Sequence, residues 1–167
     1  QCSKNINPTN FKKIFLNINK IKLTIKGKGT QSIINSGFGY KPNKIIYNNE
    51  ESTFSNSQLY LNSDINIVIL KFSSRISTCN SMFKDCSKIT EIDLTNFDSS
   101  NVGNMDLMFY GCTSLNTIIF GNFKTSNMDI MEYVFQGCES LINVDLSKFD
   151  TSSVTDFHYM FAGCKSL

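Results

Sequence analysis

A 26-residue repeat dominates the second half of this 167-residue chain. Four of the six cysteines and four of the phenylalanines follow one another at intervals of 26 residues: Cys86, Cys112, Cys138 and Cys164; Phe83, Phe109, Phe135 and Phe161. Apolar positions that recur at one fixed period are typical of proteins in which each repeat packs on the next. A single repeat cannot bury its apolar edge alone, so we expect the chain to stack as a series of coils.

Each repeat predicts a short strand, a turn and a short helix. The spacing of Leu115, Ile118 and Phe120 follows the L-x-x-L-x-L pattern of leucine-rich repeats. The other half of the unit places apolar residues at i, i+3, i+4 and i+7, the pattern of one helix face: Met131, Val134, Phe135 and Cys138. We therefore predict an α/β fold, a leucine-rich repeat solenoid over residues 66–167. It has about four coils with short parallel strands, and the last coil is incomplete at Leu167.

Residues 1–65 have a different pattern. Ile21, Leu23 and Ile25 alternate with lysines and a threonine, which predicts a strand with one buried face. Further short apolar stretches are separated by turn-forming residues. We expect these residues to form a β-rich cap, because the first coil of a stack needs a cover for its apolar face.

The repeat cysteines are expected to form a ladder in the core, with Cys86, Cys112, Cys138 and Cys164 on successive coils. Neighbouring strands lie ~4.7–4.9 Å apart, which is wider than the ~3.5–4.5 Å between Cβ atoms in a disulfide. Buried free thiols are therefore predicted. No cysteine pair has metal-site spacing, so neither a metal nor another cofactor is predicted. Cys2 lies outside the repeat, and its pairing with Cys79 or with another chain stays open.

Catalysis is not expected. The chain has one histidine, His158, and no serine or cysteine nucleophile has a base placed beside it by the pattern. Residues 27–30, GKGT, lack the spacing of a phosphate-binding loop. The longest apolar run, residues 67–70, is far shorter than the roughly 20 residues of a membrane-spanning helix. We predict a non-catalytic protein without a membrane span.

Charge divides the chain into a basic and an acidic part. Residues 1–75 carry a net charge of +8 and residues 76–167 carry −6, within a total of +2. The lysines are scattered and no arginine cluster accompanies them, so nucleic-acid binding is not expected. Head-to-tail docking of the two parts would propagate into a filament unless a ring closed. The sequence contains no usable N-x-[ST] glycosylation site, so no N-linked glycan would hinder such packing. The expected assembly ends are Lys20, Lys22, Lys26, Cys164 and Leu167.

Three segments carry a resemblance to a known family. Residues 108–115 (MFYGCTSL), 135–141 (FQGCESL) and 144–155 (VDLSKFDTSSVT) resemble the BspA-like leucine-rich repeat family. The resemblance covers about residues 66–167 and departs from the family pattern at Ile119 and Lys124. It implies a surface or secreted protein used for adhesion and for contact with a host or neighbouring cell, without enzymatic activity.

The strands of a stacked repeat protein present one broad face, where such proteins usually bind. The expected partner surface comprises Glu91, Asp93, Thr95, Thr117, Ile119, Asn143, Asp145 and Ser147. Two functions stay open. The favoured one is a recognition or adhesion module that binds protein or glycan through this face. The other is a structural subunit that assembles end to end into a homo-oligomer, filament or matrix. We expect an extracellular or cell-surface location, with a signal peptide already removed ahead of Gln1.

Overall fold

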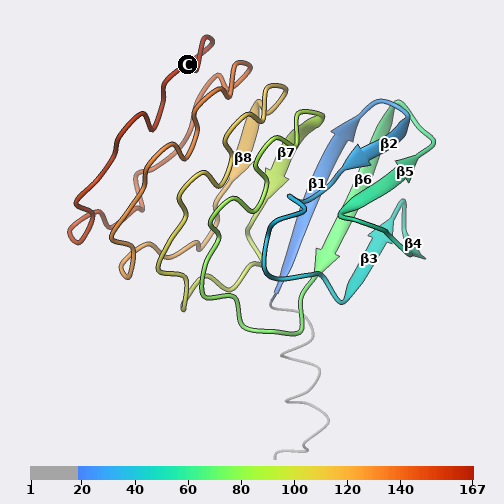
Figure 1. The fold of residues 1–167 in the computed structure, drawn as a ribbon, viewed down its shortest axis with the longest axis horizontal. Coiled ribbons are helices and arrows are strands. Elements are labelled where there is room, and N and C mark those ends of the chain that lie inside the picture. The colour runs from blue at the N-terminus through green and yellow to red at the C-terminus, as the bar shows by residue number, and fades with distance from the viewer. Residues whose placement is uncertain (1–18) are drawn as a thin grey trace, which may run out of the picture.

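The structure is a computed structural model that describes residues 19–167. Strands gather in the N-terminal part, and a series of irregular coils leads from them to the C-terminus (Figure 1). The strands are β1 (Lys20–Lys26), β2 (Gly29–Ser32), β3 (Lys44–Tyr47), β4 (Glu50–Ser52), β5 (Gln58–Leu61), β6 (Ile65–Lys71), β7 (Ile89–Asp93) and β8 (Thr117–Ile119). Cys2 and the other residues of the segment 1–18 lie outside the described part of the chain.

Six of the strands form one mixed sheet in the order β4-β3-β6-β1-β7-β8, and β2 pairs with β5 in a small second sheet. β1 lies inside the large sheet, antiparallel to both of its neighbours. Leu23 of β1 is in register with Val68 of β6 on one side and with Ile92 of β7 on the other. β7 and β8 are parallel. β1, which lies well before the repeat in the sequence, therefore joins the same sheet as the repeat strands β7 and β8.

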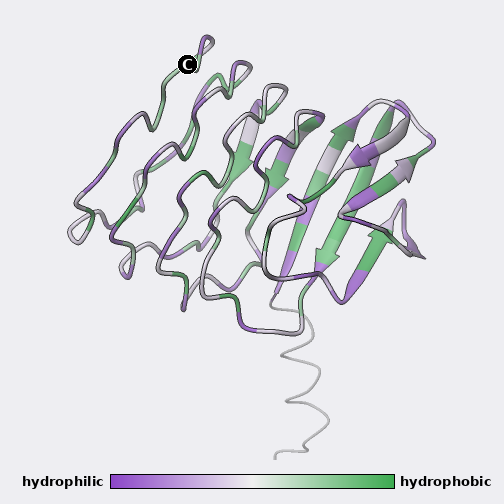
Figure 2. Ribbon diagram, viewed as in Figure 1, coloured by the Kyte–Doolittle hydropathy of each residue, from purple (hydrophilic) through white to green (hydrophobic). Residues whose placement is uncertain are grey.

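The alternation of apolar and polar residues along β1 explains why this segment forms a strand with one buried face. Ile21, Leu23 and Ile25 are fully buried, while Lys22 and Lys26 on the opposite face are exposed. Figure 2 shows the resulting alternation of hydrophobic and hydrophilic residues along this strand. A strand whose side chains point alternately to two faces adopts this pattern when only one face meets the core.

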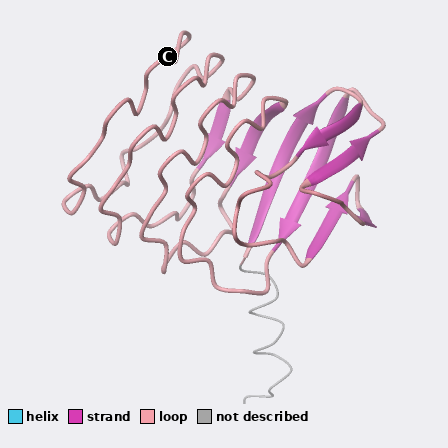
Figure 3. Ribbon diagram, viewed as in Figure 1, coloured by secondary structure: helices cyan, strands magenta, loops and turns pink. Residues whose placement is uncertain are grey.

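The prediction of an α/β leucine-rich repeat solenoid is wrong. Residues 19–167 contain no helix (Figure 3). The fold is all-β and consists of a six-stranded mixed sheet and a small second sheet, not of a leucine-rich repeat solenoid. Leu107, Tyr133 and Tyr159 lie within the three segments where a helix was expected, yet they have φ values of +55°, +55° and +52°. An α-helix needs negative φ at every residue. These segments therefore form successive turns.

Backbone hydrogen bonds between coils replace those of the expected helices. The N–H groups of Phe83, Phe109 and Phe135 each donate to a carbonyl 25 residues further along the chain, at 2.9 Å in all three cases. Their rings stack in a column that continues to Phe161, with centroid separations of 6.1, 5.5 and 5.3 Å along the column. The 26-residue period is thus the spacing between residues that lie on top of one another.

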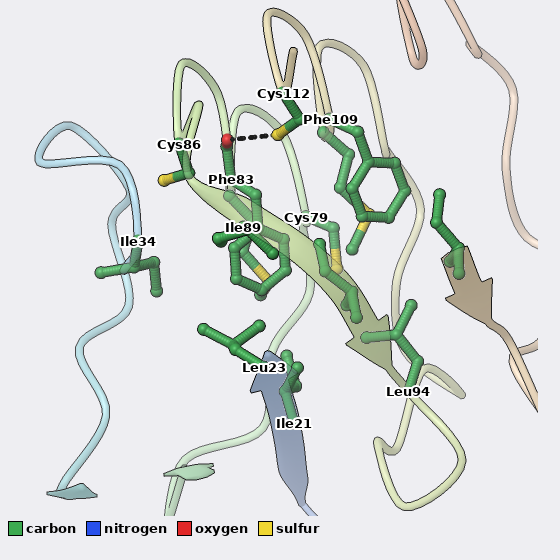
Figure 4. Packing of buried hydrophobic residues seen from close by; sticks show 14 of the residues in the cluster. Ile21, Leu23, Ile34, Cys79, Phe83, Cys86, Ile89, Leu94, Phe109 and Cys112 are labelled. Atoms are coloured by element: carbon green, nitrogen blue, oxygen red, sulfur yellow. Dashed lines mark hydrogen bonds between the residues drawn. The ribbon is translucent and has the colours of Figure 1, made fainter. Parts of the chain in front are cut away.

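A single core runs through the described residues. Figure 4 shows side chains from β1, from the loop at Ile34 and from two successive coils meeting in this core. Its buried members extend from Ile21 to Met160. The division into residues 1–65 and 66–167 stays a prediction, and the core crosses that boundary.

Candidate functional site

The outward side of the large sheet collects side chains from strands that lie far apart in the sequence. One row of register partners crosses five strands and comprises Ile46, Ile69, Lys22, Asp93 and Ile119. A parallel row comprises Ile67, Thr24, Glu91 and Thr117. We call these nine residues the outer face. Their sequence neighbours Leu23, Val68, Leu70 and Ile92 point the other way and are buried, so the core holds the outer face in place.

The chemistry of the outer face changes from strand to strand. β3 and β6 contribute half-buried isoleucines, β1 contributes lysine and threonine, and β7 contributes two carboxylates. Ile119 on β8 is an exposed apolar residue, with 42% of its surface accessible. Apolar, basic, acidic and again apolar side chains thus follow one another across the sheet. A partner with complementary chemistry would contact all four of these zones at once.

Four residues of the expected partner surface belong to the outer face: Glu91, Asp93, Thr117 and Ile119. Thr95 lies just beyond β7, where its N–H donates to Asp93 Oδ1 at 2.9 Å. Asn143, Asp145 and Ser147 are exposed in the coil that follows β8, where no strand is formed. Hydrogen bonds from the Ser147 hydroxyl and the Ser147 N–H hold the pKa of Asp145 below its ordinary value.

The expected assembly ends separate in the structure. Lys20, Lys22 and Lys26 lie on β1, in the interior of the sheet order, because this strand inserts between β6 and β7. Lys22 is the register partner of Asp93. The lysines therefore belong to the sheet surface and not to an end of the stack. Cys164 and Leu167 lie in the last coil, the former half-buried and the latter exposed.

The repeat cysteines form a ladder of free thiols through the core. Cys112, Cys138 and Cys164 donate from Sγ to the carbonyl oxygens of phenylalanines in the preceding coil, at 3.1, 3.1 and 3.0 Å. Figure 4 shows the first of these bonds, from Cys112 to Phe83. Burial raises the pKa of Cys86 and of Cys138 to about 12. These thiols therefore stay protonated and unreactive near neutral pH.

Acidic side chains and a histidine lie close together at a place where the sequence predicted no site, although the repeat aligns His158 with Asp106 and Glu132. His158 Nδ1 lies 2.5 Å from Asp156 Oδ1, and the Asp156 carboxylate is within hydrogen-bond reach of Glu132 in the preceding coil. The negative charge of Asp106, one coil further back, also acts on Glu132 and raises its pKa. Asp106, Glu132 and His158 share one column at the 26-residue period, whereas Asp156 lies in a column with Ile130 and Asn104, so only the stacking reveals its proximity to Glu132. Within residues 19–167, no three His, Cys, Asp or Glu side chains are arranged to hold a metal ion.

The pKa values of two carboxyl groups in this cluster, Glu132 and Asp156, are shifted in opposite directions. Partial burial and the neighbouring Asp156 raise the pKa of Glu132. Hydrogen bonds from the backbone N–H and the ring of His158 lower the pKa of Asp156. Glu132 therefore stabilises the fold below its unfolded-state pKa, and this contribution is lost as the pH rises through its folded-state pKa. The contribution of Asp156 is present above its unfolded-state pKa and is lost as the pH falls through its folded-state pKa.

Replacing Asp156 by asparagine should bring the pKa of Glu132 closer to its ordinary value, because the adjacent negative charge is removed. A titration of side-chain carboxyl carbons by nuclear magnetic resonance measures this. The matched control is Asp150→Asn, which also removes a carboxylate of lowered pKa, one whose partner is Ser152. An unchanged Glu132 titration in D156N would show that the two carboxylates do not interact.

The fold defines a class of protein, an all-β chain of stacked 26-residue repeats with a mixed polar and apolar sheet face. Residues 77–167 match the family described as "Mycoplasma protein of unknown function, DUF285", and since this is more than half of the chain, the chain belongs to that family. Neither a curated protein nor a solved structure matches the chain significantly. The described residues hold no helix long and apolar enough to cross a membrane.

Proposed function

We propose that this protein is a non-catalytic recognition or adhesion module that binds a protein or a glycan through the outer face. The observation that carries the proposal is the row from Ile46 to Ile119, which brings apolar, basic and acidic side chains of five strands onto one surface. A surface anchored to a continuous core can bind without reorganising, which lowers the entropic cost of association.

The resemblance of residues 66–167 to surface adhesion proteins supports the same proposal, although the leucine-rich repeat fold that it implied is not the fold of this chain. An extracellular or cell-surface location belongs to the proposal as well. Glycans and proteins both fit a face of this kind, because its hydroxyl, carboxylate and ammonium groups offer hydrogen bonds and its isoleucines offer apolar contact.

Head-to-tail assembly has less support. It required a basic end, whereas Lys20, Lys22 and Lys26 lie inside the sheet order, beside the acidic strand β7. The first coil is also covered already. Asn35 donates to its carbonyls, from the backbone N–H to Met82 at 2.8 Å and from Nδ2 to Lys84 at 3.1 Å.

Binding of the purified chain to protein and glycan arrays tests the proposal. Once a ligand is found, Lys22→Glu and Ile119→Asp should each weaken binding by about tenfold or more, as substitutions of interface anchor residues do. The matched controls are Lys28→Glu and Tyr60→Asp, because both residues are exposed and lie outside the outer face. Equal binding of the outer-face variants and the wild type would show that this surface is not used.

A further inference from the structure

Three lysines lie side by side across three neighbouring strands of the large sheet. Lys71 of β6 is the register partner of Lys20 of β1 on one side and of Lys44 of β3 on the other (Figure 1). The neighbour of each lysine within its strand is buried in the core. The three lysines therefore belong to the side of the sheet that carries the outer face, one row away from Ile46 and Ile69. We call these three residues the lysine row.

The positive charges of the lysine row are only partly compensated. Neighbouring strands lie ~4.7–4.9 Å apart, and like charges directly opposite each other destabilise a sheet. Lys44 forms an ion pair with Glu51, whereas Lys20 and Lys71 form no ion pair within residues 19–167. The segment 1–18, which precedes Lys20, contains three lysines and no acidic residue. An anionic ligand would therefore offset a repulsion that the carboxylates of residues 1–167 leave in place at two of the three ammonium groups.

We propose that the lysine row binds an acidic polysaccharide, whose sulfate or carboxylate groups lie across β3, β6 and β1. This ligand class rests on the proposed function, because it specifies which glycans would bind to this side of the sheet. Ammonium groups on adjacent strands suit a ligand with repeated negative charges, since each charge then meets an opposite one. Beside the row, the half-buried Ile46 and Ile69 offer apolar contact to the C–H groups of sugar rings.

The side chains on this side of the sheet favour a polysaccharide over a nucleic acid. Proteins bind single-stranded nucleic acids largely through aromatic side chains on which the bases stack. Neither the lysine row nor the outer face contains an aromatic residue. Arginine is the residue that best matches the geometry of a phosphate group, and the single arginine of the chain, Arg75, lies outside the strands. Lysines act as point charges, which suits sulfate and carboxylate groups on a flexible polymer.

Dextran sulfate serves as the probe and unmodified dextran as the matched neutral polymer, with binding to the full chain measured by isothermal titration calorimetry. We expect dextran sulfate to bind and dextran not to bind. The affinity should fall as the salt concentration rises, because salt screens the charges. The double variant Lys20→Gln/Lys71→Gln should bind at least about tenfold more weakly, because two ionic contacts and the counterion release that accompanies them are lost.

The matched control is the double variant Lys28→Gln/Lys165→Gln, which removes the same amount of charge outside the lysine row. In the wild type, Lys28 pairs with Asp64 and Lys165 pairs with Glu139. This control should bind dextran sulfate nearly as tightly as the wild type. Thermal unfolding distinguishes lost binding from misfolding. Without ligand, Lys71→Gln should unfold at the same temperature as the wild type or at a higher one, because a like charge is removed from the row.

Equal weakening by the two double variants would overturn the proposal, because net charge and not the lysine row would then govern binding. Tighter binding of single-stranded DNA, polyglutamate or phosphatidylserine vesicles than of dextran sulfate, at the same salt concentration, would also overturn it. If dextran sulfate does not bind but Ile119→Asp abolishes binding of a ligand found on the arrays, acidic polysaccharides are excluded and the proposed function stands. Failure of the proposed function is recognised separately, by array binding that the outer-face variants leave unchanged.

Discussion

Replacing Phe109 by alanine should lower the free energy of unfolding by about 3–5 kcal/mol, the usual cost of deleting a buried aromatic side chain. Phe109 is fully buried, its ring stacks on Phe83 and Phe135, and the ring of Phe120 meets it edge-on at 6.3 Å. Truncation would leave a cavity between two coils. Chemical denaturation followed by circular dichroism measures the loss.

The end of the same column provides the control. Among residues 19–167, Phe161 stacks only on Phe135, and it is partly exposed, so Phe161→Ala should cost clearly less than Phe109→Ala. Equal costs at the two positions would contradict the view that burial between two coils sets the energy. It would also indicate that something covers Phe161 in solution.

Replacing Asn66 by leucine should cost about 2–4 kcal/mol, because several buried polar groups would lose their partners together. Asn66 is fully buried on β6, and its Nδ2 donates to the carbonyls of Ile25, Gly27 and Ser63 at 3.2, 3.0 and 2.8 Å. Its Oδ1 accepts the Tyr47 hydroxyl at 2.8 Å. One side chain therefore joins the end of β1 to β3 and β6.

Thermal and chemical denaturation of Asn66→Leu measure this cost. Asn101→Leu is the matched control, because Asn101 is exposed and should change stability by less than about 0.5 kcal/mol. Tyr47→Phe removes one bond of the same group and should have an intermediate effect. If Asn66→Leu were as stable as the wild type, the amide would contribute nothing net to the association of these strands.

Local pattern was sufficient for part of the fold. The alternation around Leu23 identified a strand with one buried face, because a strand places successive side chains on opposite sides whatever it pairs with. The 26-residue columns marked side chains that are buried in the described coils, such as Phe83, Phe109 and Phe135. Both patterns depend on which side chains face the core, and those side chains can be recognised in the sequence because they are apolar.

Backbone conformation in the coils was predicted wrongly. Spacing at i, i+3, i+4 and i+7 buries Met131, Val134, Phe135 and Cys138, as a helix would. A series of turns with positive φ at Tyr133 buries the same residues. The turns are stabilised by hydrogen bonds to the next coil, about 25 residues away, and such bonds do not appear in a local window.

The outer face depended on tertiary structure. Glu91, Asp93, Thr117 and Ile119 could be selected from repeat positions, but Lys22, Ile46 and Ile69 could not. They join the face because β6 pairs with β3 and with β1, and because β1 also pairs with β7, a strand that begins only at Ile89. Polarity along the chain tells which side chains avoid water, whereas the choice of neighbouring strands depends on contacts that form only when the whole sheet assembles.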